Sequence, residues 1–212
     1  MGLLASLSHG STIVFPSDRF HARETVDAII HEKATALLGV PTMFLAGLDI
    51  LQATGHKVTT LRTGIIAGSS VPEPLMHRIK DQMGISGLLI AYGMTETSPT
   101  TFMTALEDPY EKRVSTLGNV MAHTSAKVID KNGNIVPWGL RGEICTSGYA
   151  LQTGYYKDEV KTREVMHRDK SGTLWMHTGD EGFIDEEGYG HITGRIKDLI
   201  IRGIATFSQS SN

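Results

Sequence analysis

The sequence has one cysteine, no long apolar run and no surplus of basic residues. A single thiol, Cys145, cannot form an internal disulfide, which favours a reducing compartment. Because Cys145 follows apolar Ile144 in an expected strand, we interpret it as a buried structural thiol rather than a nucleophile. No stretch approaches the roughly 20 apolar residues of a membrane-spanning helix. The formal net charge of −3 provides no basic footprint, so no nucleic acid partner is expected.

Several catalytic patterns are also missing. The nine histidines include no pair at zinc-ligand spacing, and we interpret them as surface or core residues. The sequence contains no Walker loop and no Gly-x-Ser-x-Gly elbow, so a hydrolase triad is unsupported. In residues 188–194 the last glycine lies one residue too far for a dinucleotide fingerprint, and no βα unit precedes it. A nicotinamide-dependent oxidoreductase is therefore the weakest of the interpretations.

The length and composition are typical of a globular protein. A chain of 212 residues with 40% hydrophobic and 20% charged residues can bury one sizeable core, or form one and a half domains. From residue 11 to about residue 105, short apolar runs alternate with helical periodicity, which predicts a βαβ layering. The expected strands are residues 11–15, 37–40, 61–67 and 88–92, and the expected helices are residues 22–33, residues 72–83 and one opened by Pro41.

The pattern changes after about residue 115. Within residues 128–136, Asn132-Gly133 predicts a hairpin because these two residues readily adopt the positive φ angles of a tight turn. Residues 183–192 have the pattern of a second hairpin, and residues 142–146 that of a strand between the two. The second part of the chain is therefore expected to be rich in β structure.

Residues 88–97 combine an apolar strand with a turn that can hold a phosphate group. Gly93 permits close backbone approach, the Thr95 hydroxyl can donate to a phosphate oxygen, and Glu96 can bind Mg²⁺ as a hard oxygen ligand. Tyr92 can lie against an adenine ring. The structural alternative is an ordinary strand exit, with Tyr92 in the core and Thr95 and Glu96 in a solvated cap.

Two later segments contain charged groups that suit a ribose or a phosphate. In Thr178-Gly179-Asp180, which we expect in a turn, the Asp180 carboxylate can accept hydrogen bonds from both ribose hydroxyls. The alternative is an aspartate that stabilises its own turn. Arg195 supplies a permanently charged fork that can reach the ribose or the α-phosphate. The alternative for Arg195, Lys197 and Asp198 is a solvated charge cluster.

Residues 67–72, Ala-Gly-Ser-Ser-Val-Pro, lie at a predicted switch from strand to helix. Open α/β sheets collect their ligands at such switches. The structural alternative is a capping turn with Ser70 as the cap of the following helix. The two roles are compatible.

Three of these segments, by their order and separation, resemble the core motifs of adenylate-forming enzymes, the acyl-CoA synthetase and AMP-binding ligase superfamily; they are residues 91–97, 178–180 and 194–198. The amino-acid sequences of three further segments resemble those of the medium-chain acyl-CoA synthetases of the family-member-2 type; they are residues 2–7, 65–69 and 197–203. The resemblance extends from about residue 1 to residue 203 but covers only the middle of the family's usual length.

The resemblance implies an α/β fold, namely a partial large domain of an adenylate-forming enzyme with βαβ layering followed by a β-rich subdomain. The expected parts are an α/β part of the AMP-binding domain over residues 1–115, a β-rich subdomain over residues 116–193, a hinge motif over residues 194–203 and a tail outside the resemblance over residues 204–212.

The reaction that the resemblance implies is the ATP-dependent activation of a fatty, medium-chain carboxylic acid by an acid-thiol ligase, with ATP, Mg²⁺ and CoA as substrates and cofactors. The carboxylate attacks the α-phosphorus of ATP to give an acyl-adenylate and pyrophosphate, and the CoA thiol then displaces AMP. No protein nucleophile is needed, so catalysis depends on positioning and electrostatics.

The resemblance also implies roles for individual residues. Thr95, Glu96 and Arg195 are the expected catalytic residues, Glu96 is the expected Mg²⁺ ligand, and Lys197 occupies the hinge position. The expected nucleotide-binding residues are Gly68, Ser69, Tyr92, Gly93, Met94, Thr95, Asp180 and Arg195.

The sequence also departs from the family. The Ser/Thr/Gly-rich phosphate loop and the C-terminal domain with its catalytic lysine have no counterpart, and Ile204 stands where a second glycine is usual. We therefore expect an internal fragment without synthetase activity of its own, which associates through exposed apolar surface and an unpaired sheet edge. The competing interpretation is a non-catalytic or pseudo-enzyme module that retains part of the nucleotide pocket.

The location is also inferred from the resemblance. Full-length members of this branch imply a mitochondrial protein. Residues 1–7 have no basic n-region and too short an apolar run for a signal peptide, so the chain itself carries no targeting segment. Expressed as given, it is expected in the cytoplasm.

Overall fold

The chain divides into two compact structural units. A computed structural model describes residues 2–196, 199–202 and 205–208. Unit 1 comprises Met1–Ala91 and Thr104–Ser115, and unit 2 comprises Tyr92–Met103 and Thr116–Asn212. The mixed α/β class expected from the sequence is confirmed, and the domain boundaries proposed above stay predictions.

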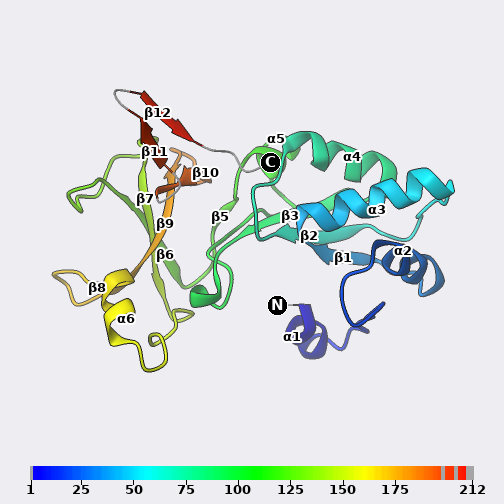
Figure 1. Cartoon of the computed structure of the whole chain (residues 1–212), viewed down its shortest axis with the longest axis horizontal. Helices are drawn as coiled ribbons and strands as arrows, with labels where there is room; N and C mark the ends of the chain where they lie inside the picture. The colour runs from blue at the N-terminus through cyan, green and yellow to red at the C-terminus, as the bar shows by residue number, and fades with distance from the viewer. Residues whose placement is uncertain (1, 197–198, 203–204, 209–212) are drawn as a thin grey trace. The chain divides into compact units, whose positions relative to one another are not determined.

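Unit 1 is built on parallel strands joined by helices (Figure 1). Strand β1 (Ala36–Gly39) pairs with β2 (Thr63–Ala67), which pairs with β3 (Gly87–Tyr92), and both pairings are parallel. Helix α3 connects β1 to β2 and helix α4 connects β2 to β3, as the βαβ pattern predicts. The helices of this unit are α1 (Gly2–Ser8), α2 (Ala22–His31), α3 (Pro41–Thr54), α4 (Glu73–Met83) and α5 (Tyr110–Ser115).

The ends of α3 and α4 follow from residues that fix the backbone. Pro41 occupies the first turn of α3, where its missing N–H is not needed. Gly55 and Gly84 end the two helices in the left-handed conformation, with φ angles of 68° and 73°, which glycine adopts without steric cost. Ile79 and Met83 of α4 are buried one helical turn apart, so the helix packs by one face.

The strand expected at residues 11–15 is wrong. Residues 11–16 carry no regular secondary structure, and Val14 and Phe15 are 40% and 70% exposed. β-branched and aromatic residues favour a strand only where a neighbouring strand completes the backbone hydrogen bonds and one face is buried. These local preferences alone did not form a strand here.

Unit 2 is dominated by an antiparallel sheet with strand order β10-β9-β7-β6, to which β8 adds by pairing with β9. These strands are β6 (Thr124–Ile129), β7 (Gly142–Gly148), β8 (Met166–Arg168), β9 (Leu174–Ile184) and β10 (Gly190–Arg195). The remaining elements are the 3₁₀ helix η1 (Thr95–Thr97), α6 (Glu159–Val165), and the antiparallel pairs of β4 (Phe102–Met103) with β5 (Asn119–Val120) and β11 (Leu199–Arg202) with β12 (Ala205–Ser208).

The core of unit 2 lies on one face of this sheet. Val128, Ile144 and Ile184 come from β6, β7 and β9, and they cluster with the fully buried Phe102 of β4. Burial of side chains of this size stabilises a fold by about 1.5–3 kcal/mol each. The core therefore fixes the faces of β7 and β9.

The two expected hairpins have different outcomes. The second is confirmed, because β9 and β10 pair on either side of a turn in which Gly188 has φ 90°. In the first, Asp130 accepts hydrogen bonds from the backbone of Asn132 and Asn134, and Gly133 has φ 82°. The returning chain contributes only an isolated bridge from Ile135 to Ile129, so the turn forms without a full second strand.

Across residues 2–196, 199–202 and 205–208, no helix combines the length and apolar character needed to cross a membrane.

Candidate nucleotide site

The Thr178-Gly179-Asp180 segment lies inside β9. We expected a turn here, but the segment does not connect two elements, so that prediction is wrong. Cys145 of β7 pairs with His177 and Glu143 pairs with Glu181, so residues 178–180 together face the single residue Ile144. We call residues 178–180 the arch. Gly179 has φ 73°, a left-handed conformation that favours glycine. The local turn signal is therefore real, but the strand continues beyond it.

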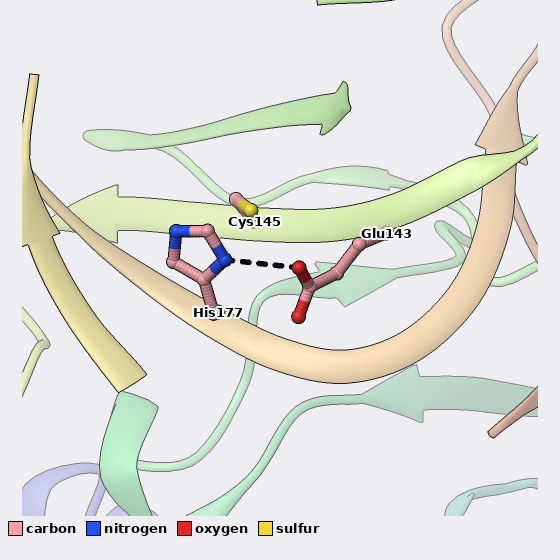
Figure 2. A group of neighbouring side chains, drawn as sticks. All are labelled: Glu143, Cys145 and His177. Carbon is pink, nitrogen blue, oxygen red and sulfur yellow. Dashed lines mark hydrogen bonds and ion pairs between the residues drawn. The ribbon is translucent and has the colours of Figure 1, made fainter. Parts of the chain in front are cut away.

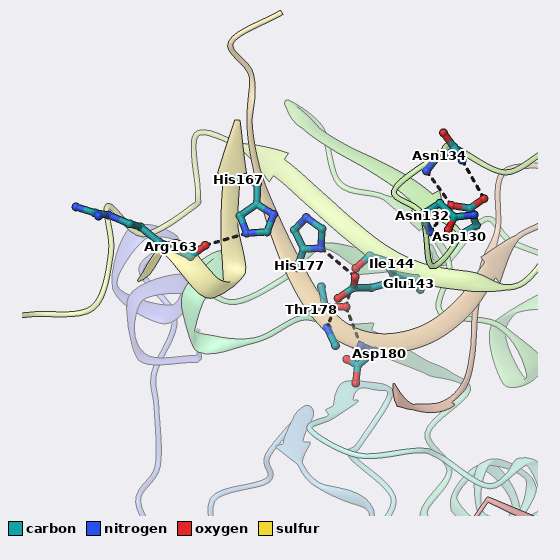
Figure 3. A network of polar contacts seen from close by, with 11 residues as sticks. Asp130, Asn132, Asn134, Glu143, Ile144, Arg163, His167, His177, Thr178 and Asp180 are labelled. Atoms are coloured by element: carbon teal, nitrogen blue, oxygen red, sulfur yellow. Dashed lines mark hydrogen bonds and ion pairs between the residues drawn. The ribbon is translucent and has the colours of Figure 1, made fainter. Parts of the chain in front are cut away.

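Two hydrogen bonds of Thr178 close the arch (Figure 3). Its hydroxyl donates to the Ile144 carbonyl oxygen at 2.7 Å and accepts the backbone N–H of Asp180 at 3.1 Å. These contacts replace sheet hydrogen bonds that a bulge would otherwise leave unmade. The arch therefore has a defined conformation that places the Asp180 side chain.

Arg195 is held against Asp180 by the register of the second hairpin. The two residues are directly paired across β10 and β9, so their side chains are cross-strand neighbours. The Nε atom of Arg195 lies 3.2 Å from Oδ1 of Asp180. The Asp180 side chain is only 13% exposed, whereas that of Arg195 is 72% exposed, so the guanidinium group extends into solvent beyond the partly buried carboxylate. It can reach an anionic ligand there.

Tyr92, the last residue of β3, contacts the same carboxylate. Its hydroxyl donates to Oδ2 of Asp180 at 2.7 Å, and its ring lies 6.1 Å from that of Phe102. Burial, followed by the charge and the hydrogen bond of Asp180, raises the pKa of Tyr92 well above its ordinary value. Tyr92 is thus a permanent hydrogen-bond donor, and Asp180 has one partner on each oxygen.

Gly93 follows Tyr92 at a point where the chain passes close to itself. A Cβ atom at this position would lie 1.9 Å from the carbonyl oxygen of Pro99, so only glycine fits. The close backbone approach expected at Gly93 therefore exists, with the chain's own backbone as the partner. Met94 precedes η1, and its backbone N–H donates to the Thr97 hydroxyl at 3.1 Å. This contact fixes the start of the segment that carries Thr95 and Glu96.

Glu96 is positioned from a distant loop. Its Oε1 atom accepts a hydrogen bond of 2.6 Å from the hydroxyl of Tyr155, and its backbone carbonyl accepts the N–H of Gln152. The hydrogen bond to Glu96, with burial and the carboxylate charge, raises the pKa of Tyr155 to about 12. Thr95 beside it is exposed. A carboxylate with an adjacent hydroxyl fits Mg²⁺, which typically takes one or two protein carboxylates together with phosphate oxygens and water.

A second group of side chains that can bind metal ions lies next to the arch. In the described part of the chain, ligand atoms of Glu143, Cys145 and His177 all lie within 4.8 Å of one another (Figure 2). Each oxygen of Glu143 already accepts a hydrogen bond, from His177 Nδ1 at 2.9 Å and from the Gly179 N–H at 3.0 Å. Burial and then the Glu143 charge raise the pKa of the Cys145 thiol to about 12. We therefore assign this group a structural role, which agrees with the buried thiol expected from the sequence.

The remaining candidate residues lie elsewhere. Gly68 and Ser69 belong to unit 1, directly after β2, where both are exposed and Gly68 has φ 90°. The alternative cap Ser70 is wrong, because Pro72 is the N-cap residue of α4. The hinge candidate Lys197 lies outside the described residues.

Local sequence patterns did not reveal the positioning roles of three residues near the site. Tyr155 contacts Glu96 over a separation of 59 residues, and Glu143 contacts Gly179 over 36. Thr178 was recognised only as part of a motif. Their roles depend on strand pairing and loop paths that local patterns do not encode.

Comparison with known proteins agrees with this architecture. Residues 1–156 match the family described as AMP-binding enzymes. The chain is 49% identical over 203 residues to acyl-CoA ligase sidI of Aspergillus fumigatus, covering 96% of this chain and 34% of that protein. It is 38% identical over 203 residues to the mitochondrial medium-chain acyl-CoA ligase ACSF2 of Bos taurus, covering 95% of this chain and 32% of that protein. The chain thus spans about a third of the length of these curated relatives.

Solved structures show the same fold. ATP-bound MatB from Rhodopseudomonas palustris is 28% identical with a TM-score of 0.81, over 98% of this chain and 39% of that one. The o-succinylbenzoate coenzyme A synthetase MenE from Bacillus subtilis, in complex with ATP and magnesium, is 25% identical with a TM-score of 0.78, over 97% of this chain and 40% of that one.

Proposed function

Since this chain belongs to the AMP-binding enzyme family, we propose that unit 2 carries the nucleotide-contacting part of an acid-thiol ligase that converts a carboxylic acid into its CoA thioester through an acyl-adenylate. The acid carboxylate attacks the α-phosphorus of ATP and releases pyrophosphate. The thiol of CoA then attacks the acyl carbon and releases AMP. Neither step requires a protein nucleophile, so the work of the chain is to bind, orient and neutralise charge.

The arrangement of Asp180 between Tyr92 and Arg195 is the observation that carries this proposal. A carboxylate that is 13% exposed and oriented by two donors is suited to accept the hydroxyl groups of a ribose, since charge-assisted hydrogen bonds are worth about 1.5–3 kcal/mol when shielded from water. The exposed guanidinium of Arg195 would then meet the α-phosphate, whose negative charge grows during the displacement.

The η1 segment supplies the complementary contacts in this proposal. The Thr95 hydroxyl donates to a phosphate oxygen, and the Glu96 carboxylate, oriented by Tyr155, holds Mg²⁺. When bound there, the ion would supply positive charge that offsets the charge of the phosphates. Tyr92, Gly93 and Met94 form the wall next to the base. Gly68 and Ser69, which belong to unit 1, are nucleotide contacts predicted from the sequence alone. Lys197 keeps the role of a hinge.

Thermal stabilisation of the purified 212-residue chain by a non-hydrolysable octanoyl-adenylate analogue tests the proposal. At a ligand concentration one hundred times Kd, binding adds about 2.7 kcal/mol to the free energy of unfolding. For a chain of this size that raises Tm by roughly 5–10 °C. We expect the shift in the parent chain and its loss in Asp180→Ala.

Asp18→Ala is the matched control, because Asp18 is an exposed aspartate of unit 1 and its substitution changes the net charge equally. A parent chain that melts cooperatively without any shift contradicts the proposed site. A shift that survives in Asp180→Ala contradicts the role of the ribose-binding carboxylate. A parallel assay of thioester formation separates a complete catalyst from a module that binds the adenylate without turnover.

Three finer features extend the proposal. The names of the mammalian relatives favour a medium-chain acid and a mitochondrial location, whereas the name of the fungal relative specifies neither.

In helix α1 the side chains of Leu4 and Leu7 are 72% and 68% exposed, which supports association through apolar surface in unit 1. Light scattering of the purified chain measures that association directly.

A further inference from the structure

The carboxylate of Glu143 contacts the backbone of the arch (Figure 3). Glu143 belongs to β7, and its Oε1 accepts the backbone N–H of Gly179 at 3.0 Å. Its Oε2 lies 2.9 Å from Nδ1 of His177, the residue that immediately precedes the arch on β9. One side chain therefore contacts both the base of the arch and its central residue.

The contact with Gly179 replaces a backbone hydrogen bond that the sheet does not supply. Because residues 178–180 face only Ile144, the central amide of the arch has no position in the regular ladder between β7 and β9. An amide without an acceptor in a partly buried site destabilises the conformation that contains it. The Glu143 side chain supplies that acceptor, and the bond is charge-assisted.

The environment keeps Glu143 ionised. Its side chain is 21% exposed, and that of His177 is 22% exposed. Burial by itself raises the pKa of Glu143, but the hydrogen bond and charge of His177, the Gly179 N–H and the charge of His167 together lower it below its ordinary value. The neighbouring Cys145 thiol remains protonated, since its pKa is about 12.

We propose that Glu143 is a positioning residue for Asp180: by accepting the Gly179 N–H it fixes the arch, and thereby the direction in which the Asp180 carboxylate meets the nucleotide. Glu143 itself does not contact the ligand. The claim that it holds the arch depends only on the contacts described here, whereas the claim that this improves nucleotide binding rests on the proposed function.

The two claims are tested with two readouts on the full 212-residue chain. Hydrogen exchange of the Gly179 amide, followed by NMR, reports the arch, and titration with the octanoyl-adenylate analogue reports the site. We expect Glu143→Ala to accelerate hydrogen exchange of the Gly179 amide by about tenfold or more and to lower the affinity for the analogue by roughly ten- to hundredfold. Glu143→Gln retains an acceptor oxygen for Gly179, so we expect it to restore most of the exchange protection and most of the affinity.

Glu164→Ala is the matched control, because Glu164 is an exposed glutamate of α6 and its loss changes the net charge equally. Rescue by Glu143→Gln separates positioning from a general loss of stability, which a Tm measurement on each variant records. If Glu143→Ala fails to fold, Glu143→Asp takes its place, because the shorter side chain cannot reach Gly179 with the same geometry. An aspartate variant that equals the parent in both readouts overturns the proposal.

The remaining outcomes are also decisive. Folded Glu143→Ala with unchanged Gly179 exchange overturns the proposal, as does faster exchange with unchanged analogue affinity. If the parent chain does not bind the analogue at all, the proposed function fails. In that case the exchange data alone decide whether Glu143 holds the arch: accelerated exchange supports this claim, and unchanged exchange refutes it.

Discussion

Substitution of Gly93 by alanine should destabilise unit 2 more than the small size of the added methyl group indicates. The new Cβ atom would lie 1.9 Å from the Pro99 carbonyl oxygen and 2.8 Å from both the Pro99 carbonyl carbon and the Thr100 Cα. All three are backbone atoms, so no side chain can rotate away. The Pro99 carbonyl would have to retreat to at least 3.0 Å, the shortest distance that Cβ atoms normally show.

The surrounding contacts resist that movement. The N–H of Thr101 donates to the Tyr92 carbonyl at 2.8 Å, and Phe102, the next residue, is fully buried in the core. Overpacking of this kind typically costs about 1–3 kcal/mol, and we expect the upper end because the backbone itself must move. Alanine also lowers the conformational entropy of the unfolded chain, which raises the free energy of unfolding by about 0.4–1 kcal/mol. The net loss is therefore about 2 kcal/mol.

Urea unfolding followed by tryptophan fluorescence measures this loss in the relevant part of the chain, because both tryptophans, Trp138 and Trp175, belong to unit 2. Gly194→Ala is the control: a Cβ atom at Gly194 meets no heavy atom within 4 Å, and we expect a change within about 0.5 kcal/mol. A Gly93→Ala chain that unfolds within about 0.5 kcal/mol of the parent would refute the steric argument.

Two further predictions concern the contacts around the site. Tyr155→Phe removes the hydroxyl that donates to Glu96 and should lower the free energy of unfolding by about 1 kcal/mol, whereas Tyr156→Phe, at a residue that is 88% exposed, should have no measurable effect in the same urea titration. Because the pKa of Glu143 is lowered by folding, its contribution to stability is complete above its ordinary pKa of 4.5 and is lost as the pH falls through the lower folded value. Parent stability should therefore decline more steeply below pH 4.5 than that of Glu143→Gln, and parallel pH profiles would contradict this sign.

Elements whose neighbours are close in sequence could be predicted well. The βαβ order around α3 and α4 followed from apolar runs, helical periodicity and the proline and glycine residues at helix ends. Residues 11–15 show the opposite case, since β-branched residues there lack the burial that makes a strand. Local preference is informative only where tertiary packing agrees with it.

The site divides in the same way. The motifs that contain Tyr92, Asp180 and Arg195 were recognised, and the structure brings these three side chains together. Local reasoning placed Asp180 in a turn because Gly179 is a strong turn signal, but the pairing of β9 with β7 continues on both sides of the arch. Contacts made by Glu143 depend on that pairing, so no sequence pattern could reveal them.

The arch also restricts how the length of β9 can change. Three residues face one, so the arch contains two surplus residues, and this even number leaves the alternation of faces intact: Met176 before it and Ile184 after it are both buried. Insertion or deletion of a single residue that no further bulge absorbs would turn Ile184 out of the core and place Phe183 or Asp185 there. A change of two residues in the arch would keep this alternation, so the buried residues on either side of it restrict the length of a segment that contributes no apolar side chain of its own.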